Sequence, residues 1–280
     1  MNLTIIGKTK VAMDEVTMKI ILSRKGFDTS NGGCANPLMP DGILLSLPIP
    51  SYDKLTYADI AYNGLPYDQL LKQLKAKIKY PGCHLDPDIR PNIRLITPSD
   101  WRPAFGQIDS AQGQLRNQCV GDGDLFLFFG WFRQVEQTAN GSFNFVHGAP
   151  NIHVIFGYLQ VERVLTRAEE VARYAWHPHS DLSRRNNNAI YLARKTLSFD
   201  ETKPGCGVLN YSENRVLTLK GCSMGTWREI PALMPNNIVS KRKNSANGQG
   251  VYYKGIWQEM VLKENIESEK WAKSVLKDQV

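Results

Sequence analysis

The sequence contains few cysteines and no closely spaced pair of them. Its five cysteines are odd in number, lie far apart and form no C-x-x-C motif. This pattern argues against a disulfide framework and against a structural zinc site, and fits reduced thiols. Long apolar runs are missing too, since no segment approaches the ~20 residues of a membrane-spanning helix. The first residues lack the basic-then-apolar pattern of a signal peptide. We therefore expect a cytoplasmic protein that does not contact a membrane.

Common nucleotide-binding and hydrolase motifs are absent as well. The sequence has no P-loop, no G-x-G-x-x-G after a strand, no H-x-E with P-C-x-x-C, and no G-x-S-x-G. Their absence argues against an ordinary kinase, dehydrogenase, zinc deaminase or serine hydrolase.

The chain is basic. Its formal net charge is +7 and its pI is about 9.1, which is compatible with a polyanionic partner but sets no fold. Two clusters concentrate the charge, one at Arg184 and Arg185 and one at Lys241, Arg242 and Lys243. Exposed Lys and Arg usually form solvated surface. The presence of two such clusters nevertheless favours nucleic acid over other polyanions as the partner.

The hydrophobic pattern predicts more strands than helices. We expect strands at 20–22, 43–47, 125–132, 153–164, 189–193, 207–211 and 214–219, and helices at 67–78, 110–117 and 257–276. The run LFLFFGWF at 125–132 is typical of a strand buried on both faces. Strands that do not alternate with helices predict a single α+β domain on a largely antiparallel sheet with flanking helices. This domain would span residues 18–280, with residues 1–17 as an appendage.

A Gly-Asp turn at 121–124 leads into the strand at 125–132. A second strand then ends in polar and charged residues. This succession resembles the barrel core of PUA-like domains, whose ASCH and EVE types bind modified bases or RNA. Ordinary strand pairs have much the same pattern, so both alternatives stay open.

The segment after the first strand is the most informative part of the chain. An apolar run stops at two basic residues, and a polar, glycine-containing loop and a Pro-Asp-Gly turn follow. Such loops present side chains and backbone N–H groups to anionic ligands. The alternative is a surface loop in which the acids and glycines serve turn geometry only. The candidate ligand-binding residues here are Arg24, Lys25, Asp28, Gly32, Gly33 and Asp41.

The segment His84-Leu85-Asp86-Pro87-Asp88 places an imidazole and two carboxylates within five residues. In an extended chain, alternation puts His84, Asp86 and Asp88 on one side. They could bind a divalent metal, or act as a base with an orienting carboxylate. The alternative is a surface turn, because Asp-Pro-Asp is common turn chemistry.

His177 and His179 form an H-x-H pair. Such a pair can bind zinc or non-haem iron when a third protein ligand is present. His84 or Asp86 could be that ligand only if the fold brings these segments together. Hydrogen-bonded structural histidines are the alternative.

A third polar group surrounds residues 101–113. Arg102 offers a planar fork for phosphate, and Gln107 and Gln112 carry the donors and acceptors that suit a base edge. Trp101 and Phe105 could stack on a base, or belong to the core. Cys34 is a further candidate nucleophile, although no histidine can be assigned to activate it.

Several long strings resemble a known family. SRKGFDTSNGG, PDG-ILLSLPIP, HLDPD, WRPAFGQ with SAQGQL, GDLFLFFGWFR, HVIFGYLQV and HPH together resemble the nucleotide modification associated domain of the third type. The likeness runs from about Met18 to the C-terminal helix. Members are bacterial and phage proteins predicted to belong to systems that chemically modify nucleic-acid bases. The resemblance implies no reaction. It implies a set of polar positions: Arg24, Lys25, Asp28, Asp41, His84, Asp86, Asp88, Arg102, Gln107, Gln112, His177 and His179.

Two functions follow from these patterns. The first is an enzyme acting on a nucleotide or on a base, with DNA the favoured nucleic acid and other proteins of a base-modification system as partners. Asp28, or His84 with Asp86, would act as acid or base, and His177 and His179 as metal ligands or proton carriers. The second is a non-catalytic, PUA-like reader of modified bases in DNA or RNA. The cofactor stays undefined, a divalent metal being one option.

Overall fold

The computed structural model describes residues 18–182, 187–240, 244–246, 248, 250–255 and 258–277. The appendage predicted for residues 1–17 and the basic clusters at 184–185 and 241–243 lie outside these residues. The described chain forms four α-helices, α1 (Tyr67–Gln73), α2 (Asp109–Asn117), α3 (Ala168–Val171) and α4 (Ile266–Val275). None of the helices found there is long and apolar enough to cross a membrane.

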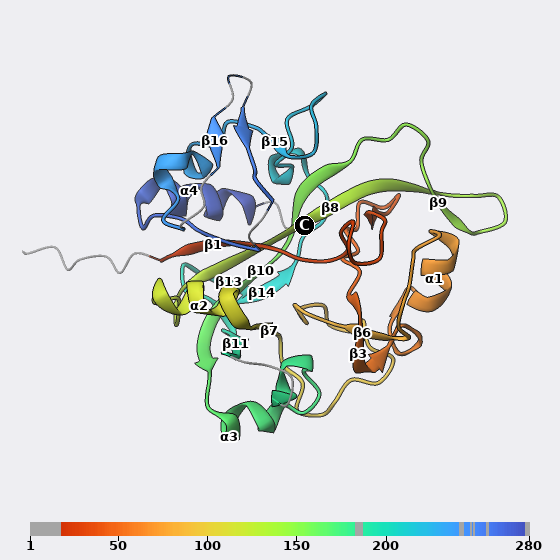
Figure 1. Ribbon diagram of the computed structural model, residues 1–280, viewed down its shortest axis with the longest axis horizontal. Coiled ribbons are helices and arrows are strands. Elements are labelled where there is room, and N and C mark those ends of the chain that lie inside the picture. The colour runs from red at the N-terminus through yellow and green to blue at the C-terminus, as the bar shows by residue number, and fades with distance from the viewer. Residues whose placement is uncertain are drawn as a thin grey trace, which may run out of the picture.

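A nine-stranded sheet crosses the molecule (Figure 1). Its main path runs through β18 (Glu259–Val261), β1 (Ile20–Arg24), β8 (Leu125–Gln137), β10 (Ile152–Leu165), β11 (Ala189–Ala193) and β7 (Ala104–Gln107). β14 (Cys206–Val208) also pairs with β10, and β2 (Asn36–Leu38) and β9 (Phe143–Phe145) pair with β8. Only β1 and β2 run parallel to their neighbour β8 among these described pairings. The mixed fold with a mostly antiparallel sheet is therefore confirmed. No pairing among the described strands closes the sheet, so the PUA-like barrel is not confirmed.

The core forms on both faces of β8 and β10, as the continuous apolar run predicts. Side chains alternate along β8, so Phe126 and Phe128 pack against Phe105 on one face. Phe129 packs against Trp227 on the other face. All five rings are fully buried, and aromatic rings of this size contribute much of the apolar area removed from water.

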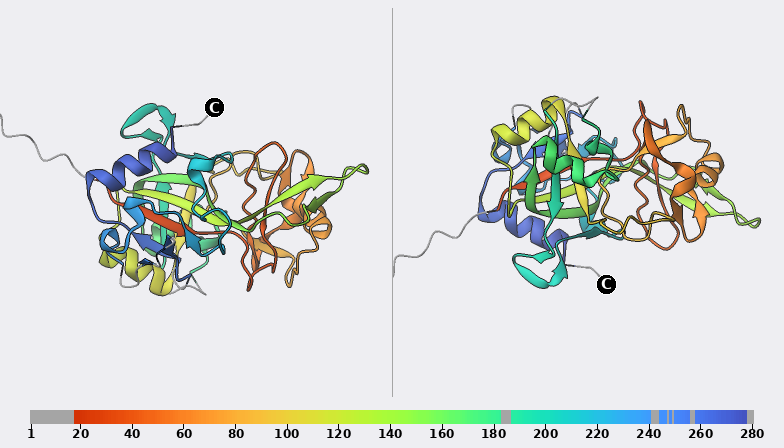
Figure 2. Two further views of the ribbon diagram at one scale, coloured as in Figure 1. Left: turned by 90° about the horizontal axis from the view of Figure 1, so that it is seen from above. Right: turned by 90° about the horizontal axis from the view of Figure 1, so that it is seen from below.

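A second, smaller apolar cluster holds the N-terminal part of the fold. There β3 (Ile49–Thr56) pairs with β6 (Gly82–His84), and α1 packs beside them through Tyr67 and Leu70. Figures 1 and 2 show this part at one end of the long strands, with α4 toward the other end. The candidate site lies where this part meets the central sheet.

Short strands complete the described fold. β4 (Ala61–Tyr62) pairs with β5 (Leu65–Pro66), and β12 (Thr196–Leu197) pairs with β13 (Asp200–Pro204). A three-stranded sheet joins β15 (Thr226–Trp227), β17 (Val251–Tyr252) and β16 (Ser245–Ala246).

Several predicted elements differ from the structure. The strand expected at 43–47 is buried but makes only isolated bridges, one of them between Ile43 and Asn210. The helix expected to reach Ile78 ends at Gln73, because Lys75 takes a positive φ of 55°. Part of the expected last helix is strand β18, which hydrogen-bonds to β1. The strand expected at 214–219 does not form. A 3-10 helix, Glu213–Arg215, begins there, and Val216 makes an isolated bridge to Val154 on β10.

Candidate functional site

A cavity of about 410 Å³ opens beside the end of β1 and the strands β3 and β6. This volume lies within the range of small-molecule sites. The cavity brings together seven of the predicted site residues: Arg24, Lys25, Asp28, His84, Asp86, Gln107 and His179. They come from positions up to 155 residues apart in the chain (179 − 24).

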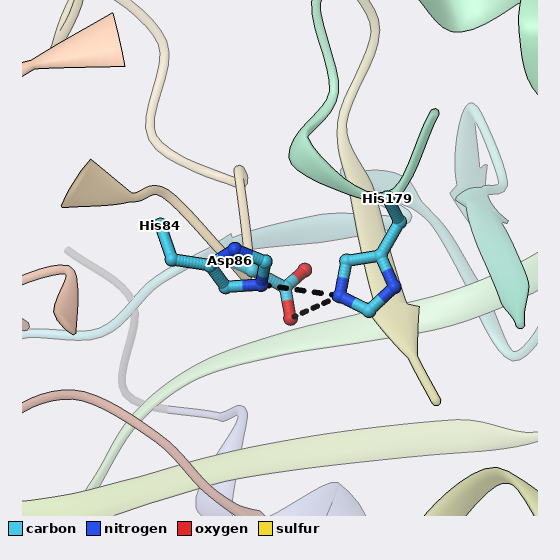
Figure 3. A group of neighbouring side chains, drawn as sticks. All are labelled: His84, Asp86 and His179. Atoms are coloured by element: carbon cyan, nitrogen blue, oxygen red, sulfur yellow. Dashed lines mark hydrogen bonds and ion pairs between the residues drawn. The ribbon is translucent and has the colours of Figure 1, made fainter. Parts of the chain in front are cut away.

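His84, Asp86 and His179 form the centre of the cavity wall. His84 is the last residue of β6, and Asp86 follows two residues later in a tight turn, in which its N–H donates to the His84 carbonyl. His179 lies in the 3-10 helix Pro178–Ser180 (η3), which packs against β7. The Nε2 atoms of His84 and His179 are 3.1 Å apart, and Asp86 Oδ2 lies 3.9 Å from His179 Nε2. Figure 3 shows the three side chains converging from these two segments.

The ring of His84 is held by Asp53. β3 pairs with β6 so that Ile49 faces His84, and the chain continues to Asp53, whose Oδ2 lies 2.7 Å from His84 Nδ1. Ser51 donates its hydroxyl to the same carboxylate oxygen. The carboxylate accepts, so His84 Nδ1 carries a hydrogen, and in the neutral ring the Nε2 that points toward His179 has a lone pair.

The ring of His179 is held in the same way by Asn188. The Asn188 Nδ2 group donates to the His179 carbonyl, which fixes Asn188 Oδ1 as the acceptor 2.8 Å from His179 Nδ1. The hydrogen of neutral His179 is therefore on Nδ1. Two unprotonated Nε2 atoms would then face each other at 3.1 Å, a repulsive arrangement that a bound cation or an extra proton would relieve.

Asp86 completes the cluster from a buried position. Its Oδ1 accepts from the backbone N–H of Gly106 at 2.7 Å and lies 3.6 Å from His177 Nε2. The His177 Nδ1 atom accepts from the His179 N–H, so its hydrogen is on Nε2 and faces Asp86. Oδ2 is left to face His179. Burial raises the pKa of Asp86, and the charge of Lys25 opposes this.

Gly106 is needed for the close approach of η3 to β7. A Cβ atom at this position would lie 2.3 Å from two carbons of the His179 ring. Carbon atoms normally approach no closer than about 3.5 Å. The missing side chain therefore makes the room in which the His179 ring sits.

The geometry of the cluster suits a metal ion. His84, Asp86 and His179 each offer one ligand atom, and these atoms all lie within 4.8 Å of one another. Two nitrogen ligands about 2.0–2.1 Å from a metal are ~2.9–3.4 Å apart when their angle is between 90° and 109°. The imidazole pair meets this spacing, and the carboxylate is somewhat farther away. Asp53 and Asn188 hold the other ring nitrogens, as is usual around metal-binding histidines.

A buried ion pair lies next to the cluster. Lys25 Nζ is 3.5 Å from Glu259 Oε1, and both side chains are almost fully buried. Gln107 and Ser23 donate to the same oxygen at 2.6 and 2.9 Å. The charge of Lys25 is therefore largely balanced by Glu259, and Gln107 orients this pair rather than pointing freely into the cavity.

Arg24 differs from its neighbour Lys25. Arg24 is among the residues that line the cavity, but alternation along β1 turns its side chain to the face opposite Ser23, where its charge acts on the buried His153 and Tyr253. Its guanidinium is therefore not placed to bind an anion beside the histidines.

The opening loop itself is held by its own hydrogen bonds. Asp28 reaches the cavity wall, but its Oδ1 accepts from the backbone of Ser30 and Asn31. Gly32 and Gly33 take positive φ angles of 83° and 67° and do not line the cavity. These two glycines allow the backbone of the loop to turn.

The remaining predicted residues lie elsewhere. Asp41 accepts from Tyr62, Arg102 pairs with Glu162, and Gln112 accepts from Tyr191. Beside the site, His177 lines a separate cavity of about 480 Å³ behind the cluster.

The other candidates from the sequence, Asp88, Phe105 and Cys34, do not line the cavity either. Asp88 forms a buried pair with Arg94, with Nη2 and Oδ2 2.7 Å apart. Phe105 is part of the core, and burial raises the pKa of the Cys34 thiol to about 11. Cys34 is therefore a protonated thiol at neutral pH and a poor nucleophile.

Sequence reasoning missed Asp53, Asn188, Tyr52 and Tyr80. All four contact or line the site, two as partners of the histidines and two at the cavity mouth. The signal for Tyr52 and Asp53 was the polar pattern SYDK at 51–54, which is common on exposed strands. The pairing of β3 with β6 brings these two residues to the site, and Asn188 reaches it from the segment between η3 and β11.

Comparison with known proteins gives one result. No match was found among curated proteins or among solved structures. The family model described as nucleotide modification associated domain 3 matches residues 19–270, about nine-tenths of the 280 residues. The chain therefore belongs to the nucleotide modification associated domain 3 family.

Proposed function

We propose that this protein is an enzyme that modifies a nucleotide or a base in nucleic acid, with DNA favoured, using a divalent transition metal held by His84, Asp86 and His179. The observation that carries the proposal is the pair of Nε2 atoms 3.1 Å apart, each on a ring whose Nδ1 is already engaged, with a buried carboxylate beside them.

The donor set favours a catalytic over a structural metal. Structural zinc sites use four protein ligands, whereas catalytic sites use three and leave a position open. Three protein ligands meet here among the described residues, and His84, with 15% of its side chain exposed, is on the cavity side. Two histidines and one carboxylate bind Fe²⁺ in oxygenases and Zn²⁺ in hydrolases. Such an ion would activate a bound water or substrate oxygen.

The family membership supports a nucleotide or nucleic acid as the class of substrate. The family's description connects it with nucleotide modification, and the net charge of +7 suits a polyanion. Other proteins of a base-modification system are the partners that this function would require.

A non-catalytic reader of modified bases is the second candidate. Its support is the aromatic pair Tyr52 and Tyr80 at the cavity mouth, which suits base binding without chemistry. A PUA-like barrel would add to that support. A reader does not need two histidines and a carboxylate that converge within the cavity, and for this reason we favour the enzyme.

Metal analysis and nucleoside analysis together test the proposal. We expect the purified protein to bind about one Fe²⁺ or Zn²⁺ per chain, and the His84→Ala and His179→Ala variants to lose it. His147 is exposed and outside the cavity, so His147→Ala is the matched control. Mass spectrometry of DNA nucleosides should show a product that depends on His84 and His179 but not on His147. Metal-free wild-type protein with full turnover would contradict the proposal.

A further inference from the structure

We propose that the cavity takes a nucleotide that is part of a single strand or is extruded from a duplex, rather than a free nucleotide. The base would stack on Tyr52 and Tyr80, and the flanking phosphates would contact Lys54, Lys77 and Lys79. This inference rests on the proposed function and names its substrate more closely.

The aromatic pair is the first observation. Tyr52 on β3 and Tyr80 just before β6 both line the cavity, with ring centroids 4.2 Å apart and planes tilted by 42°. Tyr52 is 71% exposed, which is unusual for an aromatic side chain that already has a ring neighbour. An exposed ring next to Asp53, the partner of His84, would bring a stacked base close to the metal ligands. Every base can stack on such a ring.

The charge near the cavity is the second observation. Lys54 follows Asp53 and Lys79 precedes Tyr80, so both are next in sequence to residues of the cavity wall. Lys54 lines the neighbouring cavity of about 480 Å³ together with Tyr52 and Asp53, and Lys77 lies beside Gly33 in the opening loop. They are exposed, and none forms an ion pair within the described part of the chain. Unpaired lysines beside an aromatic platform are typical of grooves that follow a nucleic-acid backbone.

The distribution of these cations favours a strand over a free nucleotide. A free nucleotide carries its charge in one phosphate group, which proteins usually bind with converging backbone N–H groups. Gly32 and Gly33 lie outside the cavity, and the N–H of Gly33 already donates to the Asp28 carbonyl. Lys54 is on β3, whereas the backbone of Lys77 donates to Gly32 in the opening loop. Cations on separate segments suit successive phosphates of one chain.

Equilibrium binding of labelled oligonucleotides tests the inference without turnover. Fluorescence anisotropy would follow the full-length protein with a 12-residue single-stranded DNA, an RNA of the same sequence, and unlabelled mononucleotide as competitor. We expect Tyr52→Ala to weaken strand binding ~10–100-fold, as base stacking on an aromatic ring does. Tyr252 is also exposed but outside the cavity, so Tyr252→Ala should bind as the wild type does.

The salt dependence gives a second measurement. Lys77→Gln with Lys79→Gln should reduce the slope of log K against log[salt] by about 1.4, since each lost phosphate contact on a single strand accounts for ~0.7. Lys270→Gln on α4 is the control for general charge. Tighter binding of either the DNA or the RNA strand would support a strand substrate, and would show whether its sugar is deoxyribose or ribose.

The inference and the proposed function can fail separately. Equal affinity of wild type and Tyr52→Ala, or displacement of the strand by an equal concentration of mononucleotide, would overturn the strand inference even if the metal is bound. Tyrosine-dependent strand binding by a protein that binds no metal would support the inference and remove the metal-dependent enzyme.

Discussion

The sharpest prediction concerns Gly106, which contacts no ligand directly. In Gly106→Ala, the new Cβ would lie 2.3 Å from the Cγ and Cδ2 atoms of His179. The backbone cannot easily retreat, because Gly106 lies in β7 opposite Ile190 of β11. The His179 ring must therefore move by more than about 1 Å to restore an ordinary carbon contact.

A shift of this size would separate the ligand atoms. His179 Nε2 would leave its position 3.1 Å from His84 Nε2, and its bond to Asn188 would be strained. Changes that disturb the orientation of metal ligands typically cost 10–100-fold in affinity, equivalent to about 1.4–2.7 kcal/mol. We expect a loss in this range for Gly106→Ala.

Competition with a chromophoric chelator would measure the affinity for Zn²⁺ or Fe²⁺, the latter without oxygen. Gly121→Ala is the matched control, because no atom lies within 4 Å of a Cβ there. Circular dichroism would establish that both variants are folded, since overpacking costs about 1–3 kcal/mol by itself. If folded Gly106→Ala binds the metal as tightly as Gly121→Ala, the proposed role of His179 is wrong.

Three further predictions concern stability and ligand orientation. Asn36 is buried and accepts from the Leu47 N–H at 2.7 Å, so Asn36→Ala should lower the free energy of unfolding by about 2–4 kcal/mol in urea denaturation. Burial lowers the pKa of His153 from 6.5 to about 3. The unfolded chain therefore takes up a proton below pH 6.5 that the folded chain does not, and stability falls as the pH falls toward 3, by at most ~1.4 kcal/mol per unit from this group. His153→Phe should flatten that slope in urea titrations, and an unchanged slope would refute the assignment. His177→Ala should weaken metal binding about 10-fold through Asp86, and His177→Gln, which keeps a donor, should restore part of it.

Local patterns predicted the strongly apolar elements well. The run at 125–132 forms a strand buried on both faces because nearly every residue in it is apolar, and its antiparallel partner at 153–164 was also predicted correctly. The pattern failed at 43–47, where residues of the same character are buried without forming a strand. The hydrogen bonds of that segment go to residues as distant as Asn210, and no periodicity within five residues can encode such a partner.

The site was predictable in part. The prediction that His84 and Asp86 lie on one side assumed alternation in an extended chain. Both residues line the cavity, but through a turn in which the Asp86 N–H donates to the His84 carbonyl. The same reasoning extended to Asp88, which the structure instead pairs with Arg94 in full burial. The H-x-H pattern does not distinguish His177 from His179, because the packing of the His179 ring against Gly106 decides which ring faces the cavity.

The balance of charge also bears on the choice between a proton and a metal at the histidine pair. Asp53 and Asp86 place two carboxylates beside two imidazoles that are neutral in the tautomers described above. Burial raises the pKa of Asp86, and the charge of Lys25 opposes this only in part. One divalent ion would compensate both carboxylates and would also give each Nε2 lone pair a partner. A single proton between the rings would satisfy the lone pairs but leave one negative charge uncompensated. For this reason a metal accounts for more of the observed geometry than protonation of the pair.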